Sequence, residues 1–387
     1  MKMRTIKTAV VGSGFMGASH IEALRRIGGV EIAAIASDDL TAAESLARKF
    51  GIRDIYENWQ KIIEDKSIEA VHNCTPNYLH FEINKSAAEA GKHILSEKPL
   101  TISSRQSKVL VELVNKKAVV NAVNFNYRFY PVIQHAKSLV AAGDVGEIYF
   151  AHGNYLQDWL FYNTDYNWRL ETEISGGSRA IADIGSHWCD MIQFITGLKI
   201  KKVFADIFTI HQTRFKPNRS LETFKGKETP GSINNDEVNV NTEDGGAVIF
   251  QFENGRRGVF SVSQVSAGRK NHFAFEINGS TKSFAWNQEN PNELWIGYRD
   301  KPNELLIKDP SLLNAEARQF AHYPGGHPEG YPDGPKNLFI QFYDVIRTGK
   351  NPQTVKPLFA TFEDGYYENK IVEAILESSK NRCWVEI

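Results

Sequence analysis

The sequence has few cysteines, no long apolar run and no excess of charge of either sign. Its three cysteines (Cys74, Cys189 and Cys383) are too few and too scattered for a disulfide framework or a zinc site. No stretch approaches the roughly 18 apolar residues of a membrane span, and the first residues lack the apolar core of a secretory signal. The net charge of −1 suggests neither a nucleic-acid nor an anionic-membrane partner. These absences predict a cytoplasmic protein that binds neither nucleic acid nor a membrane.

A chain of 387 residues suits two domains, and the texture of the sequence changes near residue 127. Before that point, short apolar strands alternate with helical stretches. The strands are expected within residues 8–14, 30–37, 69–76, 93–97 and 118–125, and the helices within residues 41–50, 80–91 and 104–117. Strands without internal polar alternation, each followed by a helix, predict a parallel sheet covered on both faces. Residues 1–127 are therefore predicted to form a doubly wound α/β domain of the Rossmann type.

Residues 128–387 contain longer, more aromatic and more alternating strands, which predict an α+β domain with a large open sheet, mostly antiparallel. The Asn254-Gly255 step is a strong hairpin signal. The polar residues 211–235 are expected to be a long loop. Helical character returns at 336–349 and 364–380, and the C-terminal helix could pack back on the first domain.

A glycine pattern follows the first predicted strand directly and opens a helix. Gly12, Gly14 and Gly17, with Phe15 and Met16 between them, have the spacing G-x-G-x-x-G. Such glycines allow a tight turn and a close approach of backbone to a pyrophosphate at a helix N-terminus. The alternative is a turn that serves packing alone, but the strand–helix–strand context favours a dinucleotide site.

The end of the second strand carries the residues that would read the adenosine ribose. Asp38, after Ser37, could accept from the ribose hydroxyls and would repel a 2′-phosphate. No arginine follows at once to bind that phosphate, so NAD is favoured. The carboxylate lies one position later than usual, which keeps NADP open, and a solvated turn residue is the plain alternative for Asp38.

Lys98 lies between Glu97 and Pro99 directly after the apolar strand 93–96. In a doubly wound sheet, ligands bind beyond the carboxyl ends of the strands, where residues 74–80 also lie. An X-Pro bond at this position can be cis and fix a sharp bend. Lys98 is therefore either a solvated strand end or a side chain aimed at the nicotinamide end of the crevice.

Asp183 and His187 are four residues apart and would share one face of a helix. A carboxylate beside an imidazole holds the ring in place and raises its proton affinity, as a general base requires. Taken alone, such a pair is more often a structural hydrogen bond. Asp190 could join it in a metal cluster, but no third ligand type is near, so no metal is predicted.

Taken together, these segments resemble the Gfo/Idh/MocA oxidoreductases over nearly the whole chain. The resemblance rests on "GSGFMG", "CTPNYLH", "SEKPL", "NYRFYP", the "GG…DIGSH" segment and the helical tail. It implies that Lys98, Asp183 and His187 form the catalytic set, with His187 as base, Asp183 orienting it and Lys98 stabilising charge on the same substrate oxygen. It also implies an open sheet that mediates a homodimer or homotetramer.

The resemblance further implies two sets of binding residues. Expected to contact the dinucleotide are Gly12, Gly14, Phe15, Met16, Gly17, Ser37, Asp38, Thr75, Pro76, Asn77, His80, Glu97, Lys98, Trp168 and Arg169. Expected to contact the substrate are Lys98, Asn126, Tyr155, Asp183, His187 and His327. Asn126 and Tyr127 depart from the inositol dehydrogenase pattern, which puts myo-inositol itself in doubt.

The leading interpretation is an NAD-dependent dehydrogenase that moves a hydride between a secondary hydroxyl of a sugar or cyclitol ring and the nicotinamide. Three alternatives stay open: an NADP-linked keto-sugar reductase, an NAD-assisted glycoside hydrolase and a non-catalytic NAD-sensing regulator. Intact Lys98, Asp183 and His187 argue against the last two.

Overall fold

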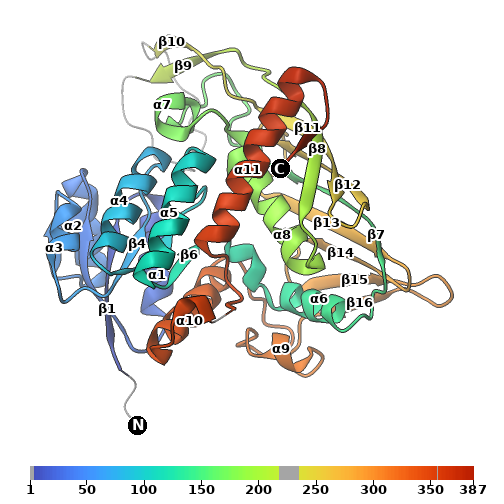
Figure 1. The fold of residues 1–387 in the computed structure, drawn as a ribbon, viewed down its shortest axis with the longest axis horizontal. Helices are drawn as coiled ribbons and strands as arrows, with labels where there is room; N and C mark the ends of the chain where they lie inside the picture. Colours follow the sequence, from blue (N-terminus) through green and yellow to red (C-terminus); the bar gives the residue numbers. More distant parts are fainter. Residues whose placement is uncertain (1–3, 218–234, 355) are drawn as a thin grey trace. The chain divides into compact units, whose positions relative to one another are not determined.

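The computed structural model describes residues 4–217, 235–354 and 356–387, and the chain forms two compact units (Figure 1). The first unit consists of residues 1–126 and 332–369, and the second of residues 127–331 and 370–387. The chain therefore leaves the first unit after Asn126 and returns to it at Pro332. The range predicted as a second domain, 128–387, is consequently not one continuous body.

The first unit is built on a six-stranded sheet with the order β3-β2-β1-β4-β5-β6, in which every pairing is parallel. Its strands are β1 Ile6–Val11, β2 Val30–Ala36, β3 Asp54–Tyr56, β4 Ala70–Asn73, β5 His93–Ser96 and β6 Asn121–Val123. This confirms the predicted doubly wound sheet. The strand order reverses between β1 and β4, and such a switch point is where α/β sheets bind ligands, beyond the carboxyl ends of the strands.

Helices connect these strands, and their ends follow the sequence closely. They are α1 Phe15–Arg25, α2 Leu40–Phe50, α3 Gln60–Glu64, α4 Asn77–Glu89 and α5 Ser104–Lys117. The Asp39 side chain caps α2 and the Ser103 side chain caps α5, each by accepting from a backbone amide of the first turn. Helices α4 and α5 lie side by side (Figure 1). The short β3 and α3 were not predicted because so few residues establish no periodicity.

Helix α10, Asp333–Thr348, completes the first unit from the far end of the chain. Arg26, the C-cap residue of α1, forms an ion pair with Asp333, and the Arg347 guanidinium donates to the carbonyls of Gly28 and Gly29. Residue Ala360 bridges to Val123 at the end of β6. Such contacts join residues more than 200 positions apart, so no local pattern reveals them.

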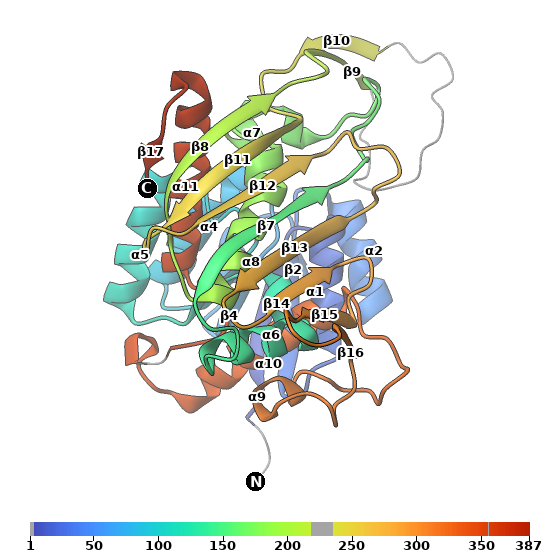
Figure 2. The ribbon, with the colours of Figure 1, turned by 90° about the vertical axis from the view of Figure 1, so that its right-hand side faces the viewer.

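The second unit is built on a nine-stranded sheet with the order β16-β15-β14-β13-β7-β12-β11-β8-β17, which Figure 2 shows face on. Its strands are β7 Ile148–Leu156, β8 Ile200–Phe208, β11 Gly245–Phe252, β12 Arg257–Ser263, β13 His272–Gly279, β14 Ser283–Asn287, β15 Glu293–Gly297, β16 Glu304–Ile307 and β17 Val385–Glu386. Only β7 and β12 pair in parallel among these strands. The predicted hairpin at Asn254-Gly255 is confirmed by the antiparallel β11–β12 pair.

One face of this sheet carries the core of the unit. Trp188 of helix α8, Ser186–Thr196, is fully buried; its ring stacks on Phe260 with centroids 4.6 Å apart and donates to the Ala274 carbonyl. Helix α6, Pro131–Ala141, packs against α8. The remaining helices with residues in this unit are α7 Thr172–Ser175, α9 Ala315–Arg318 and α11 Phe362–Asn381, the last of which spans the boundary at residue 369.

The region predicted as a polar loop, 211–235, contains regular structure at its start and end. Strand β9, Thr213–Pro217, pairs antiparallel with β10, Asn235–Asn239. The prediction of a loop is wrong for these residues, because backbone pairing and not apolar side chains defines the two strands. Residues 218–234 lie outside the described part of the chain.

Candidate active site

The glycine turn between β1 and α1 has the geometry that a dinucleotide requires. Gly12 has φ +107°, and a Cβ there would lie 2.6 Å from the Cys74 carbonyl oxygen; at Gly17 a Cβ would lie 2.0 Å from the Gly12 carbonyl oxygen. Both outer glycines are therefore demanded by packing. A Cβ on Gly14 would meet nothing within 4 Å, so the middle glycine opens space beside the N-terminus of α1. The binding of a pyrophosphate at this position remains a prediction.

At the end of β2, the hydroxyls of Ser13 and Ser37 are 2.7 Å apart. Asp39 is engaged as the cap of α2, whereas Asp38 is exposed and accepts from the Asp39 amide. Of these two carboxylates, Asp38 is thus the one that stays available to a ribose. Its predicted contact with the cofactor remains a prediction.

The loops after β4 and β5 are joined by a buried histidine. The His80 ring lies 2.9 Å from the Thr75 carbonyl through Nε2 and 2.8 Å from the Pro99 carbonyl through Nδ1. Burial lowers the pKa of His80, and the two carbonyl contacts oppose that shift. Because both ring nitrogens are engaged and the side chain is fully buried, His80 is placed to hold Thr75, Pro76 and Asn77 against the Lys98–Pro99 step.

Glu97 is buried at the carboxyl end of β5, and its carboxylate points into the protein. One oxygen accepts from His20 at 2.9 Å and from the Asn124 amide at 2.5 Å, while the other accepts from the Lys98 backbone amide at 3.3 Å. Burial alone would raise the pKa of Glu97. The hydrogen bond and charge of His20, the charge of Lys98 and the Asn124 bond outweigh it and hold the pKa at about 2.

Lys98 itself is half-buried, and the Lys98–Pro99 peptide bond is cis, as its position suggested.

In the second unit, Asp183 and His187 lie on one continuous helical segment, as their spacing predicted. Asp183 belongs to a π-helical turn, Ile181–Gly185, that leads directly into α8, where His187 is buried. Such π turns are rare and concentrate at functional sites. One Asp183 oxygen accepts from the Gln264 amide at 2.9 Å, and the other lies 3.6 Å from Nε of Arg169. Neither the π turn nor Gln264 was predicted.

A ring of hydroxyl and amide groups lies beside His187. The Tyr127 ring meets the His187 ring edge to face with centroids 4.9 Å apart, and the Tyr127 and Tyr155 hydroxyls are 2.8 Å apart. Asn271 bonds both hydroxyls, at 2.9 and 2.7 Å. Burial raises the pKa of Tyr155 well above its usual range. Tyr155 is 3% exposed, so its direct contact with a substrate remains a prediction.

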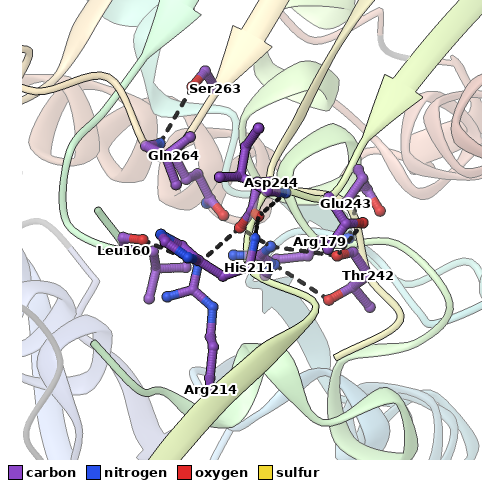
Figure 3. Close-up of polar contacts among 12 residues, drawn as sticks. Leu160, Arg179, His211, Arg214, Thr242, Glu243, Asp244, Ser263 and Gln264 are labelled. Carbon is purple, nitrogen blue, oxygen red and sulfur yellow. Dashed lines mark hydrogen bonds and ion pairs between the residues drawn. The ribbon is translucent and has the colours of Figure 1, made fainter. Parts of the chain in front are cut away.

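The segment that carries Asp183 is anchored by a buried charged cluster, formed by Arg179, Arg214, Glu243 and Asp244 (Figure 3). Asp244 forms ion pairs with both arginines, and the side chains of these three residues are fully buried. One Glu243 oxygen accepts from the Ser178 hydroxyl and from the backbone amides of Arg179 and Ile181. Glu243 thereby satisfies donors at the start of the helical segment, which fixes where Asp183 lies.

The remaining predicted residues are more dispersed. Asn126 ends the first of the two segments that form the first unit, and it is 3% exposed. Trp168 stacks under the Arg169 guanidinium, 4.4 Å from its ring centroid, in a short 3₁₀ turn. His327 is exposed on a loop whose carbonyls, including its own at 2.9 Å, accept from the buried Lys308 ammonium. The binding roles of these side chains stay predictions.

The described residues contain no group of three His, Cys, Asp or Glu side chains able to hold a metal ion. Nor does any helix within residues 4–217, 235–354 and 356–387 have the length and apolar character needed to cross a membrane.

The chain matches models of two domains. One, described as an oxidoreductase family with an NAD-binding Rossmann fold, matches residues 6–125, and the GFO/IDH/MocA C-terminal domain matches residues 133–285. The chain is 32% identical to levoglucosan dehydrogenase of Pseudarthrobacter phenanthrenivorans over 100% of this chain and 99% of that protein. It is 30% identical to scyllo-inositol 2-dehydrogenase (NAD(+)) of Bacillus subtilis, over 51% and 56%. A solved structure of levoglucosan dehydrogenase with NADH and levoglucosan covers 99% of this chain and 100% of its own, with 29% identity and a TM-score of 0.87.

Proposed function

Because the chain belongs to the Gfo/Idh/MocA oxidoreductase family, we propose that it oxidises a secondary hydroxyl of a sugar or cyclitol ring with NAD. The observation that carries the proposal is the Asp183–His187 pair on one helical segment, which Glu243 and Gln264 hold in place. An acid–base pair held this firmly is what removal of a hydroxyl proton needs.

Each residue of the set has a distinct task. His187 accepts the hydroxyl proton, and Asp183 orients the imidazole and favours its charged form. Lys98 donates a hydrogen bond to the same substrate oxygen and stabilises the negative charge that develops on it. NAD, when bound, supplies the acceptor for the hydride. The turn at Gly14 and the N-terminus of α1 bind its pyrophosphate, while Asp38 binds the adenosine ribose.

The relatives and the aromatic side chains near Asp183 both indicate a ring alcohol as the substrate class. Two relatives are named for levoglucosan and scyllo-inositol, which both have a six-membered ring that carries secondary hydroxyls. Trp159 and Trp168 both lie near the Arg169 guanidinium, at 5.9 and 4.4 Å, and offer flat apolar faces of the kind that pack on a pyranose. Asn126 and His327 are the polar groups assigned to the substrate hydroxyls.

The test is a panel of anhydrosugars, monosaccharides, glycosides and cyclitols, assayed for NADH formation and for release of the aglycone. We expect NADH to accumulate with at least one ring alcohol, with an anhydropyranose such as levoglucosan tried first. Glycoside cleavage without net NADH would favour the NAD-assisted hydrolase, and turnover of keto-sugars with NADPH alone would favour the reductase. Binding of NADH without turnover of any panel member, in either direction, would favour the regulator.

We also assign the open face of the nine-stranded sheet to self-association. Phe150, Ile249 and Val259 are between 36% and 43% exposed on adjoining strands of that face. Apolar side chains gathered in this way mark interaction surfaces. Light scattering should give a homodimer or homotetramer, and Val259→Lys should dissociate it. No disulfide joins Cys74, Cys189 and Cys383, which supports our assignment of the protein to the reducing environment of the cytoplasm.

A further inference from the structure

A chain of buried hydrogen bonds runs from the Glu97 carboxylate through two histidines to a tyrosine. Nε2 of His20 lies 2.9 Å from a Glu97 oxygen, Nδ1 of His20 lies 2.9 Å from Nδ1 of His72, and Nε2 of His72 lies 2.8 Å from the Tyr343 hydroxyl. All four residues belong to the first unit, and the two histidines and Tyr343 are completely buried. The chain therefore runs from α10 through β4 and α1 to the end of β5.

The donors in this chain can be assigned from chemistry alone. An ionised carboxylate only accepts, so Nε2 of His20 must carry a proton and donate it to Glu97. The bond between the two Nδ1 atoms holds one proton. Burial keeps the pKa of His72 well below its usual range, so His72 is neutral and has one proton to place.

When His72 carries that proton on Nδ1, Nδ1 donates to His20 and Nε2 accepts a hydrogen bond from the Tyr343 hydroxyl. When His72 carries it on Nε2, His20 donates from both nitrogens and Tyr343 accepts. In either arrangement every bond in the chain is made, and His20 donates to Glu97. The chain thus fixes the direction of the His20–Glu97 bond whatever the charge of the His20 ring.

We infer that His20 is a positioning residue that keeps Glu97 ionised and thereby fixes the backbone of Lys98. The ionised carboxylate accepts from the Lys98 backbone amide and so holds the backbone at the start of the Lys98–Pro99 step. Glu97 then acts on the reaction through Lys98 instead of touching the cofactor. This inference rests on the proposed catalytic role of Lys98.

Other groups around Glu97 do not replace His20. Asn124 donates to the same oxygen, while His80, Lys98 and the Cys74 thiol also feel the charge of Glu97. His80 is already engaged with two carbonyls, and Asn124 carries no charge. Without His20, the Glu97 carboxylate loses its principal donor, so the pKa of Glu97 should rise by about one unit or more.

The experiment compares the pH dependence of kcat/KM for the wild type, His20→Leu, His20→Gln and the double variant His20→Leu/Glu97→Gln. We expect His20→Leu to lose activity on the acid side as Glu97 is protonated, with a midpoint displaced about one pH unit or more above that of Glu97 in the wild type. His20→Gln, which keeps an amide donor, should lie between the two. The double variant should lack this displaced ionisation, because it no longer carries the Glu97 carboxylate.

His135→Gln is the matched control, since His135 is another buried histidine but belongs to α6 of the second unit. Its acid limb should match that of the wild type. NADH fluorescence at each pH verifies that every variant remains folded and binds cofactor.

An unchanged acid limb in His20→Leu would overturn the inference, as would an ionisation that persists in the double variant. If the wild type turns over no ring alcohol, or if Lys98→Ala is fully active, the proposed function has failed instead. Should His20→Leu not fold, the comparison of His20→Gln with and without Glu97→Gln decides the same question.

Discussion

The two units solve the problem of buried charge in different ways. In the first unit, the Glu97 carboxylate is held by a chain of rings, His20 and His72, that ends at the Tyr343 hydroxyl. In the second unit, the Asp244 carboxylate is held by two guanidinium groups, those of Arg179 and Arg214. Arginine stays charged under all ordinary conditions, whereas imidazole gains or loses a proton near neutral pH.

This difference matches what each unit contributes. The arginine cluster anchors a helical segment and should be insensitive to pH, which suits a frame for Asp183 and His187. The histidine chain lies behind the loop that carries Lys98 and can rearrange its protons without losing a bond. The second unit therefore holds Asp183 and His187 on a rigid frame, and the first unit holds Lys98 next to an adjustable polar network.

The largest effect is expected from breaking the arginine cluster. Asp244→Asn leaves two buried guanidinium groups without their shared charge, which should lower the free energy of unfolding by about 3 kcal/mol or more. Urea unfolding measures this directly. The control is Asp206→Asn, whose exposed pair with Arg382 should contribute less than about 1 kcal/mol. Equal losses in both variants would mean that the cluster does not carry the stability assigned to it.

The next largest effect is expected from removing proposed catalytic side chains, which should lower activity without disturbing the arginine cluster. Lys98→Ala and His187→Ala should each lower kcat by on the order of 100-fold or more while NADH still binds, since acid–base and charge-stabilising groups contribute that much. Steady-state rates at saturating NAD and substrate measure kcat for each variant. Lys116→Ala, an exposed lysine of α5, is the control for the first variant. Near wild-type turnover in either variant would remove that residue from the catalytic set.

The pH dependence of stability sharpens the contrast between the two networks. The folded-state pKa of Glu97, about 2, lies below its usual 4.5, so Glu97 stabilises the protein above about pH 4.5 and this contribution is lost as pH falls toward 2. Glu97→Gln should therefore be less stable than the wild type at neutral pH, and the gap should narrow as the solution is acidified. Denaturant midpoints from roughly pH 6 to pH 3 test this. A gap that stays constant would show that Glu97 is not the group being titrated.

The smallest effect is expected at Asp38, an exposed residue that follows strand β2 of the first unit. Asp38→Ser should narrow the preference for NAD over NADP by about tenfold, because it removes one acceptor for the ribose and one repulsion of the 2′-phosphate. The ratio of kcat/KM for the two cofactors measures the change. Glu57→Ser, another exposed carboxylate of this unit, should leave the ratio as it was. If Asp38→Ser does the same, Asp38 does not read the ribose.

Local pattern was enough to predict the structural features that depend on short-range geometry. The spacing of Gly12, Gly14 and Gly17, the hairpin at Asn254-Gly255 and the four-residue step from Asp183 to His187 all follow from backbone rules that act within a few residues. The parallel sheet of the first unit also followed, because each apolar strand is followed by a helix.

What the sequence did not reveal depends on distant contacts. His20 meets Glu97 across 77 positions, and Arg26 meets Asp333 across 307. Gln264 reaches Asp183 across 81 positions, and nothing in its neighbours sets it apart from any other polar strand end. The strands β9 and β10 were missed because their pairing depends on each other and not on an apolar pattern.

The central claim is that His187 accepts the hydroxyl proton and that Asp183 acts through it. The most direct measurement is a double-mutant cycle on kcat/KM with Asp183→Asn, His187→Ala and the double variant, together with the pH profile of Asp183→Asn. We predict that the double variant is little worse than His187→Ala alone, because groups that act as a unit are not additive. We also predict that the pKa of the basic group falls in Asp183→Asn, since a histidine without an anionic neighbour binds its proton less tightly. Losses that multiply fully, with an unshifted profile, would contradict the account.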